Sequence, residues 1–237
     1  SGLQVAVVYS ALSPTAQSAA GEIRWLVTDD SQTGEFDALT AAATPWDGVE
    51  VSETDIGQLL YTSGTTSNPK GCLHTHRGLC TVPAYTRATV GLQRDDRFLI
   101  AMPIWHASPL NNWFLSMIFM GGTVVLMKEY HPIEFLKLIE RHQVTAFFGA
   151  PIAYLAPLQV ATAQGIDLSS FDLSSGRLWI YGGAPLGADA VRKLQQAYDS
   201  DNFYQVYGMS EMGPVGTALY PSEQVGKAGS IGAAGMP

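Results

Sequence analysis

The chain of 237 residues is 46% hydrophobic and 14% charged, which describes a globular protein with a sizeable core and excludes a disordered one. Its 13 basic and 21 acidic residues give a formal net charge of −8, which argues against a nucleic-acid-binding surface. The length fits one large domain or two small ones.

Apolar, β-branched runs alternate with amphipathic stretches along the chain. We predict strands at Leu3–Tyr9, Ile23–Thr28, Leu59–Tyr61, Arg97–Met102, Thr123–Met127, Val144–Phe148, Arg177–Tyr181 and Asn202–Val206. We predict helices at Glu35–Ala43, from a Thr75 N-cap to Val90 with a kink or division at Pro83, and at Leu110–Met120, Pro132–His142, Ile152–Ala163 and Leu186–Tyr198. This alternation predicts an α/β fold, a layered and largely parallel sheet flanked by helices.

The remaining segments are predicted to be connectors. Ser10–Gly21 is small and polar, and the polar segment after Lys70 reads as the entry to a helix. Residues 1–54 are interpreted as leading strands and connectors, and residues 55–237 as the core that carries the motifs. Ser222–Pro237 is rich in Gly, Ala and Ser and has no obvious capping element, so we expect a chain cut in mid-domain.

The most informative stretch is Leu59–Cys72, Leu-Leu-Tyr-Thr-Ser-Gly-Thr-Thr-Ser-Asn-Pro-Lys-Gly-Cys. Small residues at 62–66 let backbone N–H groups approach an anion, their hydroxyls add donors, and Lys70 adds a positive charge. These features favour a phosphate-binding loop, although an ordinary Ser/Thr/Gly surface loop has the same composition. Pro69 and Gly71 exclude the Walker geometry, because proline lacks a backbone donor and glycine lacks the hydroxyl that would hold magnesium.

Two further turns follow predicted strands. Gly182–Pro185 (Gly-Gly-Ala-Pro) offers bare backbone against which a flat ring can lie, and Gln205–Glu211 combines a ring, a hydroxyl and a carboxylate. Taken singly, each is also compatible with an ordinary turn. Because ligands gather beyond the carboxyl ends of parallel strands, we expect these turns and the phosphate loop to share one site.

A third motif, Pro103–Pro109 (Pro-Ile-Trp-His-Ala-Ser-Pro), places His106 in an apolar run. A lone histidine there is commonly a satisfied core residue. Trp113, Phe114 and Met117 follow on a predicted helix, where they either line an apolar site or belong to the core.

The pattern Tyr-Thr-Ser-Gly-Thr-Thr-x-x-Pro-Lys-Gly at residues 61–71 resembles the signature loop of the adenylate-forming enzymes, and Tyr-Gly-x-Ser-Glu at 207–211 is similar to a second motif of that family. The family includes acyl-CoA synthetases or fatty-acid–CoA ligases, the adenylation domains of peptide synthetases, and luciferases. One departure is Ser67, where the family usually has glycine; a positive φ there would strain a serine.

This resemblance implies roles for individual residues. It assigns nucleotide binding to Thr62, Ser63, Gly64, Thr65, Thr66, Lys70, Gly182, Gly183, Ala184, Pro185, Gln205, Val206, Tyr207, Gly208, Met209 and Ser210. It assigns catalytic roles to Lys70, His106 and Glu211, metal binding to Thr62 and Glu211, and an acid pocket to Trp105, His106 and Trp113. Amino-acid-activating relatives carry Phe-Asp where this chain has Trp105-His106, so the implied acid lacks an α-amino group.

The implied reaction joins ATP to a carboxylic acid as acyl-AMP, with Mg²⁺, and then forms a thioester with coenzyme A. By resemblance the chain is an incomplete N-terminal domain of an acyl-CoA synthetase-like fold: the ribose-binding Gly-Asp stretch and the small C-terminal domain with its catalytic lysine are absent from the sequence. We therefore expect weak nucleotide binding and no complete turnover by this chain alone. The alternatives are a non-catalytic nucleotide-binding or interaction module and a peptide-synthetase-type adenylation domain.

Two other features bear on cellular context. Cys72 and Cys80 lack the spacing and histidine partners of a zinc site, which favours reduced thiols in a cytoplasmic protein, and no signal peptide is evident. The run from Phe98 to Met127 carries no charged residue, but prolines, asparagines and a Gly-Gly pair interrupt it. We predict no membrane span there.

Overall fold

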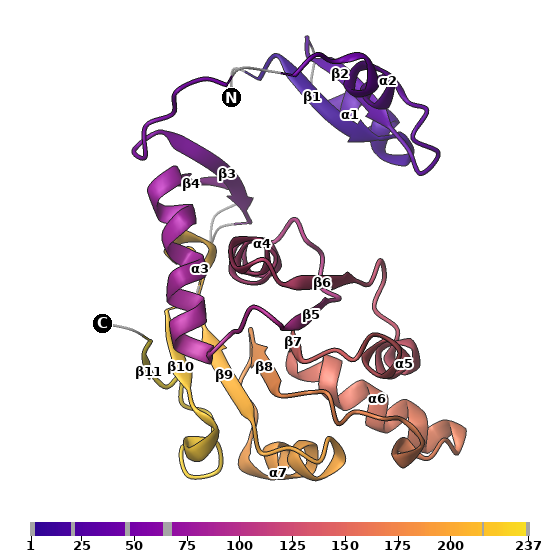
Figure 1. Cartoon of the computed structure of the whole chain (residues 1–237), viewed down its shortest axis with the longest axis vertical. Helices are drawn as coiled ribbons and strands as arrows, with labels where there is room; N and C mark the ends of the chain where they lie inside the picture. The colour runs from indigo at the N-terminus through magenta and orange to yellow at the C-terminus, as the bar shows by residue number, and fades with distance from the viewer. Residues whose placement is uncertain (1–2, 20–21, 46–47, 64–67, 215, 236–237) are drawn as a thin grey trace. The chain divides into compact units, whose positions relative to one another are not determined.

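The computed structural model describes residues 3–19, 22–45, 48–63, 68–214 and 216–235. The chain divides into two compact units, Ser1–Glu50 and Val51–Pro237, each of which is described by itself (Figure 1). The candidate residues Gly64, Thr65 and Thr66 lie outside the described residues, as does Ser67.

The first unit is a small βαβ arrangement followed by a helix. Its elements are β1 (Val5–Tyr9), the 3₁₀ turn η1 (Ser10–Leu12), α1 (Ser13–Ala19), β2 (Arg24–Thr28) and α2 (Glu35–Ala42), with β1 and β2 parallel. The prediction of a plain connector at Ser10–Gly21 is wrong, because α1 lies there. Pro14 is in its first turn, where proline is tolerated, and Gln17 Nε2 donates to Ser13 Oγ at 3.0 Å.

The second unit contains a seven-stranded sheet in the order β11-β10-β9-β8-β7-β5-β6. Its parallel strands are β5 (Arg97–Ile100), β6 (Thr123–Leu126), β7 (Ala146–Gly149), β8 (Leu178–Gly182) and β9 (Phe203–Tyr207). Two short antiparallel strands, β10 (Thr217–Leu219) and β11 (Ala233–Ala234), extend the β9 edge and were not predicted. The predicted α/β fold with a largely parallel sheet is confirmed.

Helices cover both faces of this sheet (Figure 1). They are α3 (His76–Val90), the π-helical turn η2 (Ser108–Phe114), α4 (Leu115–Met120), α5 (Pro132–His142), α6 (Pro151–Gln164) and α7 (Ala188–Ala197), with 3₁₀ turns η3 (Leu168–Ser170), η4 (Ser210–Met212) and η5 (Pro221–Glu223). Alternate strand residues enter two separate cores: Phe147 packs with α5, α6 and α7, whereas Phe148 packs with α3, η2 and α4. The strands are therefore buried on both faces, as in other parallel sheets.

The predicted helix entry after Lys70 is wrong. Residues Lys70–Thr75 form strand β4, which pairs antiparallel with β3 (Ile56–Thr62) in a separate two-stranded sheet. We call β3 and β4 the signature hairpin. The helix begins only afterwards, at His76, where Thr75 caps it as predicted by accepting from Gly78 N at 3.2 Å.

Two other helix predictions need correction. We predict a kink or a division at Pro83; α3 is one helix through this residue, so a division there is wrong, and Pro83 is buried, as are Thr86 and Val90. The predicted helix at Leu110–Met120 begins earlier and is π-helical at first. The uncharged run from Phe98 to Met127 thus folds as β5, η2, α4 and β6, and no helix among the described residues has both the length and the apolar character needed to cross a bilayer.

A buried ion pair connects the amino ends of three neighbouring strands. Asp96, which is 2% exposed, precedes β5; its carboxylate accepts from Arg177 Nε at 2.8 Å and from Thr145 Oγ1 at 2.7 Å. Thr145 and Arg177 directly precede β7 and β8. The backbone N–H of Gln93 also donates to Asp96, so the carboxylate is fully paired in its buried position.

Arg177→Ala is expected to reduce the free energy of unfolding by about 2–3 kcal/mol, because it leaves the Asp96 carboxylate buried with only its neutral donors. Arg192 makes an exposed ion pair with Asp189 on α7, so Arg192→Ala is a matched control with an expected change within about 0.5 kcal/mol. Urea unfolding followed by circular dichroism measures both. Equal losses in the two variants would contradict a structural role for the buried pair.

Candidate functional site

A cavity of about 260 Å³ lies beyond the carboxyl ends of β8 and β9. It is lined by Met102, His106, Ser108, Pro109, Asn112, Phe148, Ala150, Gly182, Gly183, Ala184, Val206, Tyr207, Gly208 and Pro214. Three of the predicted motifs therefore meet here: the Trp-His stretch, the Gly-Gly-Ala turn and the Tyr-Gly turn. Among its described lining residues there is no Asp or Glu.

The two glycines at the end of β8 shape one wall of the cavity. A Cβ atom on Gly182 would lie 2.7 Å from the carbonyl oxygen of Val206, so only glycine lets β8 and β9 approach this closely. Gly183 has a φ of +80°, which favours glycine, and a Cβ there would meet no atom within 4 Å. The backbone beside the cavity therefore carries no side chain at these two positions, so a planar ring could lie directly against it.

The three residues predicted for an acid pocket lie in three different places. His106 lines the cavity and is exposed. Trp105, which is 72% exposed, borders a separate hollow beside Leu126 and Tyr130. Trp113 is buried in the core, and its ring lies between Phe98 and Phe148 at centroid distances of 5.1 and 5.0 Å, so it supports the cavity wall from behind.

The residues of the Tyr-Gly stretch also lie in different surroundings: some line the cavity, one is in the core and others are exposed. Tyr207 and Gly208 line the cavity, whereas Gln205 is 4% exposed and its Oε1 accepts from Tyr181 Oη at 3.2 Å in the core. Ser210 begins the 3₁₀ turn η4, and Glu211 within that turn is exposed. The exposed residues Pro185 and Met209 do not line the cavity.

The signature hairpin lies next to η4, because β4 packs against that turn. Thr62 and Lys70 are directly opposite each other in the ladder, so their side chains share a face of the hairpin. Further along β4, Cys72 Sγ is 3.3 Å from His74 Nε2. Burial, and secondly the negative charge of Glu211, raise the pKa of the Cys72 thiol. Glu211 is therefore close enough to β4 to act on it electrostatically.

Sequence reasoning missed two contributions to this site. Asn112 is 1% exposed and lines the cavity, and its Oδ1 has no hydrogen-bond partner within the described part of the chain. Phe148 and Pro214 add apolar wall. The available signal was a pair of asparagines inside an uncharged apolar run, where a buried amide requires a partner.

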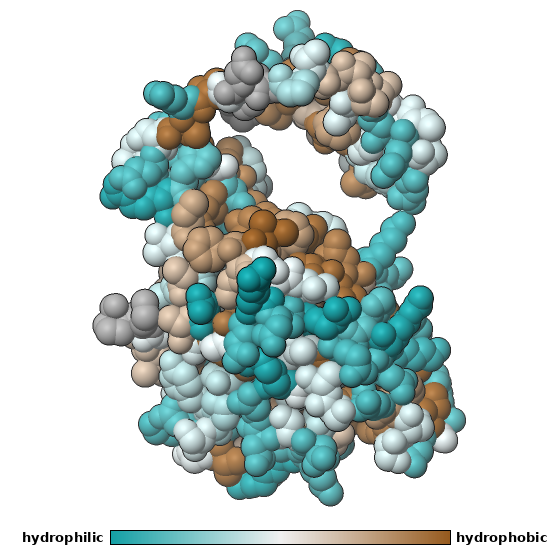
Figure 2. All heavy atoms as spheres, viewed as in Figure 1, coloured by the Kyte–Doolittle hydropathy of each residue, from teal (hydrophilic) through white to brown (hydrophobic). Residues whose placement is uncertain are grey.

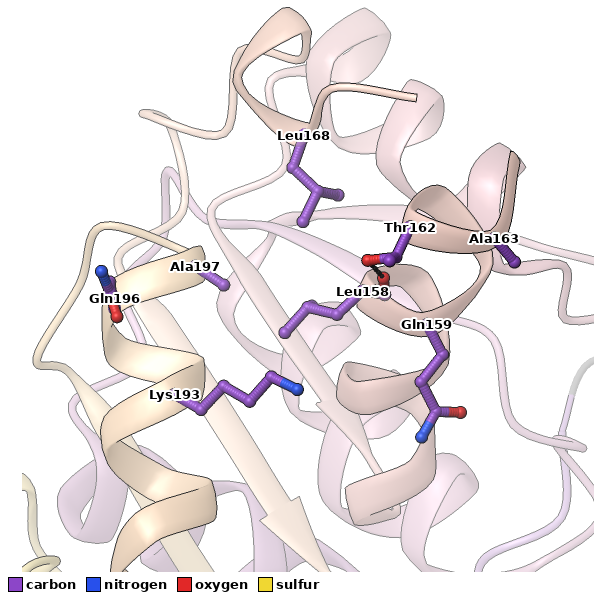
Figure 3. A pocket seen from close by; sticks show the side chains of 8 residues that line it. All are labelled: Leu158, Gln159, Thr162, Ala163, Leu168, Lys193, Gln196 and Ala197. Atoms are coloured by element: carbon purple, nitrogen blue, oxygen red, sulfur yellow. Dashed lines mark hydrogen bonds between the residues drawn. The ribbon is translucent and has the colours of Figure 1, made fainter. Parts of the chain in front are cut away.

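A second, larger hollow of about 650 Å³ lies between α6 and α7 (Figure 3). Leu158, Leu168 and Ala197 give it an apolar floor, and Lys193 borders it. The hydroxyl of Thr162 is already used, donating to Leu158 O at 2.8 Å. None of the residues predicted for nucleotide or acid binding lines this hollow.

The model of the AMP-binding enzyme family matches residues 2–237. The chain belongs to the AMP-binding enzyme family. This match confirms the resemblance predicted from the signature loop. No group of three or more His, Cys, Asp and Glu side chains suited to a metal ion occurs among the described residues.

Characterised relatives of this AMP-binding chain include CoA ligases. The chain is 30% identical to a 4-coumarate-CoA ligase of Narcissus pseudonarcissus, over 90% of this chain and 40% of that protein. It is 37% identical to a feruloyl-CoA synthase of Amycolatopsis sp, over 86% of this chain and 39% of that protein. The chain thus spans about two fifths of the length of these relatives.

Solved structures of similar fold cover nearly the whole chain. The N-terminal domain of FACL13 from Mycobacterium tuberculosis is 25% identical, with a TM-score of 0.82, over 97% of this chain and 56% of that one. ATP-bound MatB from Rhodopseudomonas palustris is 23% identical, with a TM-score of 0.80, over 98% of this chain and 45% of that one. At 23% identity, the similarity to MatB supports the fold alone.

The position of Glu211 beside β4 can be tested through the reactivity of Cys72. In a Cys80→Ser background, Glu211→Gln should accelerate alkylation of Cys72 by N-ethylmaleimide at pH 8 by roughly two- to fivefold, since a largely solvated charge contributes under about 1 kcal/mol. The sign follows because removal of a negative charge lowers the pKa of the thiol and increases the thiolate fraction. Asp189→Asn on α7 is the remote control, and an unchanged rate in Glu211→Gln would place the carboxylate away from β4.

Proposed function

We propose that this chain carries the nucleotide and acid sites of an acid–CoA ligase, which converts a carboxylic acid and ATP to acyl-AMP and pyrophosphate and then transfers the acyl group to coenzyme A. The observation that carries the proposal is the meeting of His106, Gly183 and Tyr207 at one cavity beyond the parallel strands. The CoA-ligase relatives support the same reaction class. The whole 1–237 segment is then part of the nucleotide-binding large domain.

The chemistry requires two anions to approach each other. In the adenylation step a carboxylate oxygen attacks the α-phosphorus of ATP, a new O–P bond forms, and pyrophosphate leaves with the electrons of the broken bond. Lys70 offsets the negative charge of the phosphates, and Thr62 and Ser63, which lie in and just beyond β3, supply hydroxyl donors to the phosphate oxygens. Gly64, Thr65 and Thr66, which lie outside the described residues, are assigned to the same loop by the family resemblance alone.

The donor set next to the hairpin fits Mg²⁺. Glu211 is exposed on η4 beside β4, and Thr62 adds a hydroxyl; Mg²⁺ in nucleotide sites takes one or two such protein oxygens together with substrate phosphates. When bound, the ion would neutralise phosphate charge. Glu211 and Thr62 are proposed to hold it, while Tyr207 and the bare backbone of Gly183 border the adenine ring.

The part of the cavity proposed to hold the carboxylic acid favours a substrate with a compact, uncharged substituent. The whole cavity, part of which borders the proposed adenine position, measures about 260 Å³, below the roughly 300–1,000 Å³ range of drug-sized ligand pockets, and none of its described lining residues is a carboxylate that could pair with an ammonium group. The aromatic wall from Phe148 suits a planar acid. We infer a short or single-ring acid without an α-amino group, in keeping with the substrates named for the coumarate and ferulate relatives.

Lys70→Ala should weaken binding of ATP·Mg²⁺ about 10- to 100-fold, the loss expected for a charge-assisted hydrogen bond to phosphate. Isothermal titration calorimetry on the wild-type chain and the variant measures the dissociation constants. Lys193→Ala, on α7 beside the hollow in Figure 3, is the matched control and should leave the affinity unchanged. Absence of binding heat with the wild-type chain would contradict the proposed function and favour a non-catalytic interaction module.

Selection against an α-ammonium group can be measured with two acids that differ only in that group. In the presence of AMP, 3-phenylpropanoic acid should bind at least about tenfold more tightly than phenylalanine, because an unpaired ammonium in this cavity loses hydration without gaining a carboxylate. Thermal-shift titration gives the two affinities. Tighter binding of phenylalanine would favour the peptide-synthetase-type alternative.

A further inference from the structure

A reciprocal pair of side-chain amides joins two segments that are far apart in the sequence. Gln58 Nε2 donates to Asn111 Oδ1 at 3.1 Å, and Asn111 Nδ2 donates to Gln58 Oε1 at 2.8 Å. Asn111 is fully buried and Gln58 is half-buried. Each amide thus uses one donor and its acceptor on the other, which fixes their relative orientation.

The pair connects the two halves of the candidate site. Gln58 lies in β3, four residues before Thr62, on the strand whose partner begins with Lys70. Asn111 lies in η2, immediately before the cavity-lining Asn112. The signature hairpin, proposed to bind phosphate, is thereby bonded to the segment that forms the acid side of the cavity.

Local backbone geometry directs both amides to this contact. The β3–β4 register is irregular between Ile56 and Gln58, and such irregularities re-aim side chains. On the other side, η2 is π-helical, a geometry that often occurs at functional sites. Within it Asn111 faces Gln58, Asn112 faces the cavity and Trp113 enters the core.

The hairpin does not belong to the seven-stranded sheet; it contacts α3 and η4, and this amide pair joins it to η2. In the described part of the chain, no other side-chain hydrogen bond joins β3 or β4 to η2. A one-residue slip of β3 would put Gly57 or Leu59 at the contact, and neither has an amide to pair with Asn111. The pair therefore selects one register and one position of the hairpin.

We propose that Gln58 and Asn111 are positioning residues that hold the signature hairpin at the edge of the cavity. The part of this inference that concerns catalysis rests on the proposed function, because the two residues would act through Thr62, Lys70 and Asn112. The structural claim, that the pair immobilises the hairpin against η2, is independent of any ligand.

The test uses Gln58→Ala, Asn111→Ala, the double alanine variant and the exchanged pair Gln58→Asn/Asn111→Gln, which retains two facing amides of the same total length. The matched control is Asn202→Ala: the Asn202 side chain donates to Arg177 O at the amino end of the sheet, remote from the carboxyl-end cavity. Asn202→Ala therefore removes a structural side-chain hydrogen bond without touching the site. Two readouts are measured on each variant, hydrogen–deuterium exchange of the hairpin and η2, and the dissociation constant of ATP·Mg²⁺.

Each single alanine variant should speed exchange in both β3–β4 and η2 by about fivefold or more, and weaken ATP·Mg²⁺ binding by a similar factor. The double variant should be no worse than either single one, because the amides act as a unit. The exchanged pair should recover most of the loss, and Asn202→Ala should leave both readouts at the site unchanged even where its global stability is lower.

Two outcomes would overturn the inference: wild-type exchange in the hairpin of Gln58→Ala and Asn111→Ala, or equal site effects in Asn202→Ala. Failure of the proposed function is distinguishable from these. If the wild-type chain binds no ATP·Mg²⁺, exchange in the hairpin still decides whether the pair has its positioning role. Faster exchange with an unchanged nucleotide affinity would contradict the link from the pair to Thr62 and Lys70.

Discussion

The buried ion pair of Asp96 with Arg177 fixes the end of the sheet opposite the cavity. Asp96, Thr145 and Arg177 each precede a neighbouring parallel strand, and their hydrogen bonds set how β5, β7 and β8 start. Since parallel strands begin at one edge and end at the other, the turns that form the cavity lie at the opposite edge. Gly183 lies beside Tyr207 because β8 pairs with β9 in the register Gly182 to Val206, a close approach that glycine at position 182 permits.

The side of the site proposed to bind phosphate is organised differently, because the signature hairpin is a separate two-stranded sheet whose location depends on contacts with α3, η2 and η4. The apolar side chains of the neighbouring helix layer are partly open: Ile118 and Phe119 of α4 and Leu126 of β6 are exposed, and Figure 2 shows apolar atoms gathered over this region. Ile56, Leu59 and Tyr61 of β3 are exposed as well, so specific polar contacts contribute to the hairpin's position where hydrophobic burial is limited.

Elements that are set by residues close together in the sequence could be predicted, whereas those that are set by contacts between distant residues could not. Strands β5 and β7–β9 were predicted within two residues because burial on both faces makes them apolar runs, and α5 was predicted at both ends because Pro132 and its apolar face are local signals. Strand β4 was missed because its pattern becomes a strand only through pairing with β3. Gln58 and Asn111, 53 residues apart, have no local signal at all, and neither does the opposition of Asp96 and Arg177.

Charge imposes a further constraint on the site. With a formal net charge of −8, long-range electrostatics oppose the approach of a polyanionic nucleotide, and at physiological ionic strength this repulsion is screened beyond about 8 Å. The proposed binding must therefore depend on short-range donors, and Lys70 at the start of β4, directly opposite Thr62, is the proposed source of them. None of the described residues that line the cavity is a carboxylate, whereas Glu211 lies on η4 outside this lining. In the proposed reaction this separation would let Glu211 provide an oxygen ligand for a cation without repelling the carboxylate of the acid, as the joining of two anions requires.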